Sequence, residues 1–113
     1  MMETTPKNGD IFERRLRPRC KCDYSARIRG RDEDGNLFQV DGKATNLSRN
    51  GVYLIVNRDI PKGMELSIRI AFPTGSLELG TSKLVVRGTV VRGELFSEKT
   101  YGIAVKFDKY RFL

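Results

Sequence analysis

The sequence predicts an all-β domain, with a small closed barrel favoured over a sandwich. Apolar and polar residues alternate with period two in several short segments, while no window of the 113 residues has convincing helical spacing. Turn-forming residues separate these segments about every 8 to 12 positions, as in small barrels and sandwiches. A chain this short favours closure, because a closed barrel leaves no strand edge exposed.

The first half of the chain contains three expected strands. Residues 20–28 alternate between apolar and polar side chains, so one face of this strand should be buried. A turn at residues 32–36 leads to a weaker strand at residues 37–44, in which a bulge is expected at residues 41–42. Residues 51–56 are rich in β-branched and aromatic side chains and should lie in the middle of the sheet.

The second half continues the same pattern after a loop at residues 57–63. A strand is expected at residues 66–72, and residues 101–107 form a last clean alternation. At most one helical turn is expected after it, at residues 108–113. Between these strands, residues 77–95 hold short strand-like runs broken by glycines. The runs are residues 77–79, 84–86 and 90–91, and the glycines are Gly80, Gly88 and Gly93.

Composition argues against the common enzyme classes. The chain has no histidine, which excludes histidine-based triads and ordinary zinc sites. Cys20 and Cys22 are too close together to staple a fold and are expected in the core, since two thiols alone rarely hold a metal. We therefore expect no catalytic residue, no metal and no cofactor. Four aromatic residues should also lie in the core, namely Tyr24, Tyr53, Phe72 and Phe107.

Charge is concentrated near the N-terminus. The formal net charge is +7, and residues 14–31 alone hold eight cations against one carboxylate. Such a segment indicates an anionic partner, which from charge alone is a nucleic acid, a nucleotide or an acidic protein. Residues 1–12 are expected to form a disordered arm, and residues 13–113 a single domain. With no secretory signal and no apolar run long enough to span a bilayer, a cytoplasmic protein without a membrane partner is expected.

Two clusters have residue types suited to ligand binding. Residues 14–19 read Arg-Arg-Leu-Arg-Pro-Arg, and Pro18 keeps the preceding residue out of the helical region. Guanidinium groups donate in a fork to phosphate or to guanine, although such a run can equally be a solvated basic arm. Residues 46–51 read Asn-Leu-Ser-Arg-Asn-Gly, in which amide and hydroxyl groups either meet a base edge or only hold a turn.

Taken together, the two clusters resemble the PilZ domain family. Arg15-x-x-x-Arg19 stands before the first strand, and Asn46-x-Ser48-x-x-Gly51 begins 27 positions after Arg19. The apolar strand after Gly51 and the closing strand at residues 101–107 add to the likeness. The resemblance implies a six-stranded antiparallel β-barrel that binds cyclic di-GMP, a bacterial second messenger.

The resemblance also implies roles for individual residues. Arg15 and Arg19 would reach the phosphates and guanine faces, Asn46 and Ser48 would meet a guanine edge, and Gly51 would allow close approach. Asn46 stands where the family often has aspartate, so it offers one acceptor and one donor amide. Two further cations lie outside the two motifs. Arg14 is expected to help hold a second, stacked ligand, and Arg92 either reaches the ligand or lies on a solvated face.

The expected function is that of a non-enzymatic receptor. Binding of cyclic di-GMP would order the arginine-rich arm, change the conformation of the chain and regulate a protein effector in motility, exopolysaccharide synthesis or biofilm formation. A monomer or a ligand-linked dimer is expected. The alternative is a PilZ-like interaction module that binds no nucleotide. No DNA or RNA partner is expected, because the aromatic residues predicted for the core leave no stacking platform.

Overall fold

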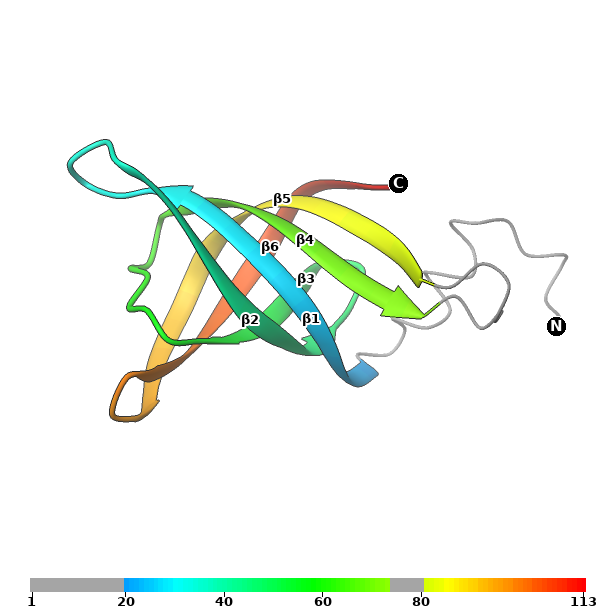
Figure 1. Cartoon of the computed structure of the whole chain (residues 1–113), viewed down its shortest axis with the longest axis horizontal. Coiled ribbons are helices and arrows are strands. Elements are labelled where there is room, and N and C mark those ends of the chain that lie inside the picture. The colour runs from blue at the N-terminus through cyan, green and yellow to red at the C-terminus, as the bar shows by residue number, and fades with distance from the viewer. Residues whose placement is uncertain (1–19, 74–80) are drawn as a thin grey trace, which may run out of the picture.

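The computed structural model describes residues 20–73 and 81–113, and there every regular element is a strand (Figure 1). The strands pair antiparallel and close into a barrel in the order β1-β2-β3-β6-β5-β4. The predicted six-stranded antiparallel β-barrel is therefore confirmed. Their bounds are β1 (Cys20–Arg31), β2 (Leu37–Leu47), β3 (Gly51–Val56), β4 (Glu65–Pro73), β5 (Thr81–Ser97) and β6 (Thr100–Phe112).

Several sequence-based expectations fall on residues that the structure does not describe. The arm at residues 1–12 and the run at residues 77–79 with Gly80 lie outside the described ranges. The side chains of Cys20, Cys22 and Phe72 are also outside the description. In the described ranges, no helix is long and apolar enough to cross a membrane.

The core of the barrel follows directly from the alternating pattern. Every second residue of a strand points inward, and these positions are occupied by aliphatic side chains. Burial of each such side chain stabilises the fold by roughly 1.5–3 kcal/mol. Tyr24 and Phe107 are partly buried against this core, as predicted. The largest fully buried side chains include Ile28, Leu54, Ile68, Ile70, Leu84 and Ile103.

The bulge expected at residues 41–42 is not there. Asp41 pairs with Arg27 and Gly42 with Ala26 in unbroken register, and the irregularity in β2 lies between Ala44 and Asn46. The need for glycine at position 42 has a different reason, because a Cβ there would lie 2.6 Å from the carbonyl oxygen of Ile55 on β3. The glycine marks a close approach of backbone rather than an extra residue.

The second half of the chain forms longer strands than the sequence indicates. Gly88 and Gly93 lie inside one continuous strand, β5, so they do not separate shorter runs. Register shifts between Arg87 and Gly88 and between Val90 and Arg92 absorb the irregularity. Residues 108–113, where at most one helical turn was expected, instead continue β6 to Phe112. They do so because alternate aromatic side chains of this segment pack against the core.

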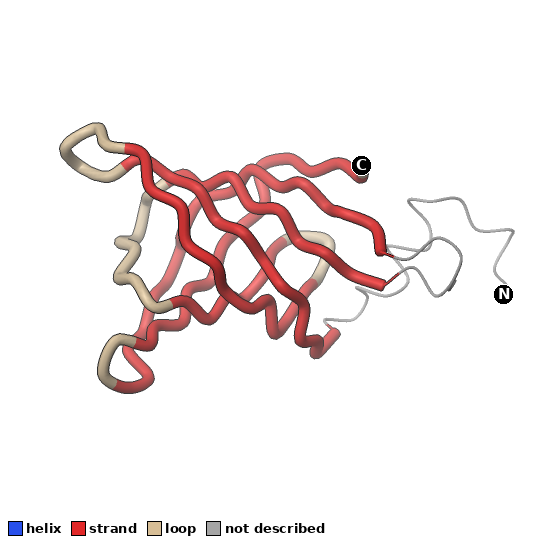
Figure 2. The backbone as a smooth tube through the Cα atoms, viewed as in Figure 1, coloured by secondary structure: helices blue, strands red, loops and turns tan. Residues whose placement is uncertain are grey.

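The loops lie at two ends of the barrel (Figure 2). The connections at residues 32–36, 57–64 and 98–99 gather at one end, whereas the turn at residues 48–50 lies toward the other. This arrangement separates the Asn46–Gly51 motif from the other described loops. The residues around the motif are therefore supplied by strands.

Candidate functional site

The turn that contains Ser48 is held by its own side chain. The Ser48 hydroxyl accepts hydrogen bonds from the backbone N–H groups of Asn50 and Gly51, each at 3.2 Å. The backbone N–H of Ser48 donates to the carbonyl of Gly51 at 2.9 Å. The Asn50 carbonyl accepts from Phe107 N–H at 2.8 Å, which ties the turn to β6. The serine at this position thus has a structural role of the kind expected for hydroxyls in turns.

Asn46 lies at one end of a row of residues that crosses four strands. It pairs with Tyr53 on β3, which pairs with Ala104 on β6, which in turn pairs with Arg92 on β5. The register shift between Val90 and Arg92 is what brings Arg92 opposite Ala104. No hydrogen bond joins the half-buried side chain of Asn46 to another residue of the described part of the chain.

This row forms part of a pocket of about 420 Å³ on the outer surface of the barrel, which we call the motif pocket. The volume lies within the range of about 300–1,000 Å³ that is typical of small-molecule sites. Its lining includes three motif residues and polar or charged residues from elsewhere in the chain. Among them are Asn46, Ser48, Gly51, Tyr53, Arg92 and Lys106.

The motif pocket has a positive rim. Arg92 and Lys106 are both exposed, and neither forms an ion pair with a carboxylate within residues 20–73 and 81–113. Arg92, for which the sequence allows either a ligand contact or a solvated face, lies at this pocket. Lys106 was missed, although its outward position in the alternation of residues 101–107 was visible in the sequence.

Gly51 is required by the barrel itself. A Cβ at this position would lie 2.5 Å from the carbonyl oxygen of Val105 on the paired strand β6. Real Cβ atoms almost never approach an atom so closely, so any side chain here would push the strands apart. Close approach of backbone is therefore sufficient to explain the glycine, whatever else it permits at the pocket.

The prediction that Tyr53 is a core residue is wrong. Its neighbours Val52 and Leu54 are both buried, so Tyr53 faces outward. Its ring covers Gly102 and lies 6.3 Å from the ring of Phe96. The Tyr53 hydroxyl donates a hydrogen bond to the Glu94 carboxylate. Partial burial, followed by this hydrogen bond and the negative charge of Glu94, raises the pKa of Tyr53 to about 12.

A pH titration tests this contact. The pKa of Tyr53 is raised in the folded chain, so its contribution to stability is fully present below pH 10.0 and is lost as the pH rises through about 12. In near-ultraviolet absorbance, Tyr53→Phe should remove the late tyrosine transition. Glu94→Gln should lower the pKa of Tyr53, because the negative charge that opposes ionisation of the phenol is lost while the burial remains. An unchanged transition in Glu94→Gln would show that the Glu94 carboxylate does not lie beside the Tyr53 hydroxyl.

The remaining predicted site residues, Arg14, Arg15 and Arg19, lie outside the described residues. The start of β1 is described, and there Cys20 pairs with Leu47 and Lys21 with Asn46. The chain therefore enters the barrel beside the strand end that carries Asn46. In the described ranges, no group of three or more residues with metal-ligating side chains occurs.

Comparison with known proteins identifies a family for this chain and a solved structure with a similar fold. The sequence matches the model of the family described as PilZ domain over residues 13–111. No curated protein matches the chain significantly. Among solved structures, the chain is similar to the Bacillus subtilis inhibitor of motility (MotI/DgrA), with a TM-score of 0.64 and 14% identity. The similarity covers 80% of this chain and 41% of that one, so the chain spans less than half of that protein.

Proposed function

Because the chain belongs to the PilZ domain family, we propose that it is a non-enzymatic receptor for cyclic di-GMP. The ligand binds at the motif pocket, with Arg15 and Arg19 on its phosphates and guanine faces. The observation that carries this proposal is the convergence of Asn46, Ser48 and two cations, Arg92 and Lys106, beside the start of β1. Neither cation forms an ion pair with another described residue. The arginine pair of the motif is one residue upstream of that point at its nearest.

The chemistry of the pocket suits a dianion that carries two guanines. The Asn46 amide supplies one acceptor and one donor group, and both types are present on the edge of guanine. The Tyr53 ring offers an apolar surface in the same pocket. Arg92 and Lys106 add positive charge on the side of the pocket opposite β1, so anionic ligand is attracted from both sides.

A receptor without catalytic activity acts by passing the binding signal to another molecule. We propose that the loaded receptor changes its conformation and its contacts with a protein effector in the cytoplasm. The structural neighbour is described as an inhibitor of motility, which makes motility the first process to test ahead of exopolysaccharide synthesis and biofilm formation.

Calorimetric titration of cyclic di-GMP into the purified chain tests the site. We expect micromolar or tighter binding, and in Asn46→Ala a loss of about tenfold, which corresponds to about 1.4 kcal/mol. The Asn46 side chain makes no hydrogen bond within the described part of the fold, so this loss reports on the ligand contact. The matched control is Asn57→Ala, which changes an exposed asparagine in the loop at the other end of the barrel.

Absence of binding would support the alternative. If no heat is released and the NMR spectrum of the chain is unchanged by cyclic di-GMP, the chain is an interaction module that binds no nucleotide. If Asn46→Ala and Asn57→Ala weaken binding equally, the ligand lies somewhere other than the motif pocket.

A further inference from the structure

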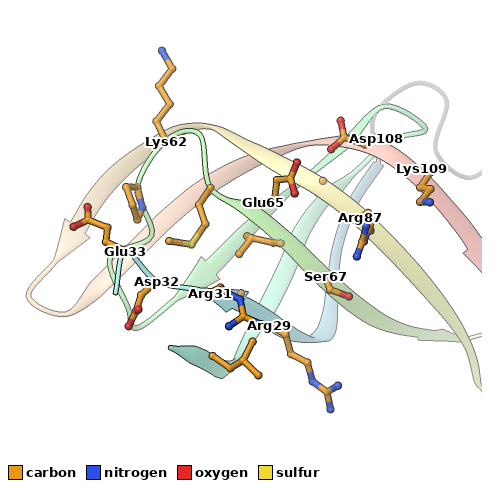
Figure 3. Close-up of a pocket in the computed structure, with 16 residues that line it drawn as sticks. Arg29, Arg31, Asp32, Glu33, Lys62, Glu65, Ser67, Arg87, Asp108 and Lys109 are labelled. Atoms are coloured by element: carbon orange, nitrogen blue, oxygen red, sulfur yellow. The ribbon is translucent and has the colours of Figure 1, made fainter. Parts of the chain in front are cut away.

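The outer surface of the barrel carries cations in rows that cross β1, β4, β5 and β6. In one row Arg29 pairs with Ser67, Ser67 with Arg87, and Arg87 with Lys109. Figure 3 shows these four side chains following one another across the strands. A parallel row, two residues further along each strand, has the same arrangement. Its members are Arg27, Arg69, Val85 and Arg111.

We call the outward side chains of these two rows the basic face. Its six cations are all exposed, and on β1, β4, β5 and β6 the two rows contain no carboxylate; on β2 the second row continues at Asp41. Direct cross-strand pairs of like charge occur twice, between Arg27 and Arg69 and between Arg87 and Lys109. Like charges placed directly opposite one another destabilise a sheet. A bound anion would relieve this repulsion.

Little of this charge is neutralised within the chain. Arg27 forms an ion pair with Asp41 at 3.3 Å, and Arg29 donates a hydrogen bond to Gln39 at 2.8 Å. Among the described residues, the other four cations form no ion pair. The positive potential of the basic face is therefore left for a partner.

The basic face is hollowed where it meets β2. A hollow of about 670 Å³ has small residues along it, including Ser25, Gly42 and Ala71. Arg69 and Lys83 stand at its sides, and Asp41 is the only carboxylate among its lining residues. A second hollow of about 900 Å³ lies toward the loop end and shares Arg29 with the first. It has charges of both signs, as Figure 3 shows.

We propose that the basic face binds an extended, acidic segment of a protein partner. Outward residues of a strand are about 6.6–6.8 Å apart, which is also the spacing of carboxylates at every second position of an extended peptide. The two rows are therefore spaced to meet two successive carboxylates of such a segment lying along β1 or β6. Arginine, which makes up five of the six cations, also forms paired hydrogen bonds with carboxylates.

The chemistry of the face favours a peptide over a nucleic acid. Single-stranded nucleic acids are held by stacking of bases on exposed aromatic rings as well as by charge. The outward side chains of the two rows include no aromatic residue. The acidic segment would belong to the protein effector of the proposed receptor, so this inference rests on the proposed function. The basic face is nevertheless separate from the motif pocket, with which it shares no lining residue.

Fluorescence anisotropy with a labelled peptide tests the proposal. The probe is a peptide of about ten residues with glutamate at every second position, at low ionic strength and without nucleotide. Arg69→Gln/Arg87→Gln should weaken binding by about tenfold, because two of the uncompensated cations are lost. Arg92→Gln/Lys99→Gln removes the same charge from exposed residues that line neither hollow of the basic face, and should change the affinity less than about twofold.

Each outcome bears on one proposal. Equal losses in the two double variants would overturn the basic face as a site, because only net charge would then matter. Tighter binding of a DNA or RNA oligonucleotide than of the peptide would overturn the choice of partner. Titration of cyclic di-GMP into Arg69→Gln/Arg87→Gln separates the proposals: unchanged nucleotide affinity shows a folded chain with an intact motif pocket. Failure of nucleotide binding in the wild type would overturn the receptor proposal but not peptide binding.

Discussion

Replacement of both Arg15 and Arg19 by alanine should lower the affinity for cyclic di-GMP by about 100-fold or more. A hydrogen bond to a charged group contributes about 1.5–3 kcal/mol, so two such residues account for at least two powers of ten. Both arginines precede β1, whose start pairs with the strand end that carries Asn46. Calorimetry on the double variant, beside the wild type, measures the loss directly.

The matched control for this variant is Arg69→Gln/Arg87→Gln. It removes the same number of guanidinium groups from the basic face, so any shared loss of affinity measures the general electrostatic field. If the two double variants lose affinity equally, Arg15 and Arg19 do not contact the ligand.

The same titration gives the number of cyclic di-GMP molecules bound per chain. Two ligands per chain, falling toward one in Arg14→Ala, would support a second stacked ligand, whereas one ligand in the wild type would contradict it.

The two proposed surfaces predict opposite patterns of loss. Arg15→Ala/Arg19→Ala should lose nucleotide and keep the acidic peptide, while Arg69→Gln/Arg87→Gln should do the reverse. The physical basis is that the two surfaces are formed by different residues of the barrel. Even where both use β5 and β6, the motif pocket has Arg92 and Lys106, and the basic face has Arg87 and Lys109.

Alternation in the sequence predicted the number of strands and much of the interior of the barrel, but not the full length of β5 and β6. Ile28 and Ile68 occupy inward positions of alternating segments, and both are fully buried. Tyr53 could not be placed in this way, because residues 51–56 are apolar at nearly every position and show no alternation. The structure shows that Val52 and Leu54 point inward, so Tyr53 between them points outward.

The composition of the motif pocket could be predicted only in part. Asn46, Ser48 and Gly51 are near one another in the sequence, so a local motif identifies them. Arg92 reaches the same row through pairings across β3 and β6 and through a register shift in β5. Alternation within one strand contains no information on which residues of another strand lie opposite, and a bulge changes that pairing by a residue. The presence of Arg92 in the same row as Asn46 therefore follows only from the strand pairings of the closed barrel.

The largest expected loss of stability follows from truncation of Leu54 to alanine. Leu54 has no exposed surface, and its direct neighbours on β2 and β6 are the buried residues Ala44 and Ile103. Ala44 is already small, so the cavity left by the leucine cannot be filled from that side. Leu→Ala substitutions at such sites cost about 3–5 kcal/mol in the free energy of unfolding. Urea denaturation followed by circular dichroism measures it.

Leu95→Ala is the chemically identical control at an exposed position. Leu95 is 64% exposed near the end of β5, so its truncation should change the free energy of unfolding by less than about 0.5 kcal/mol. A large difference between the two variants would show that stability resides in the interior of the barrel. Equal and small effects would mean that the core readjusts around Leu54. In that case the row from Asn46 to Arg92, which is built on the outside of the same strands, would not be held rigidly by the core.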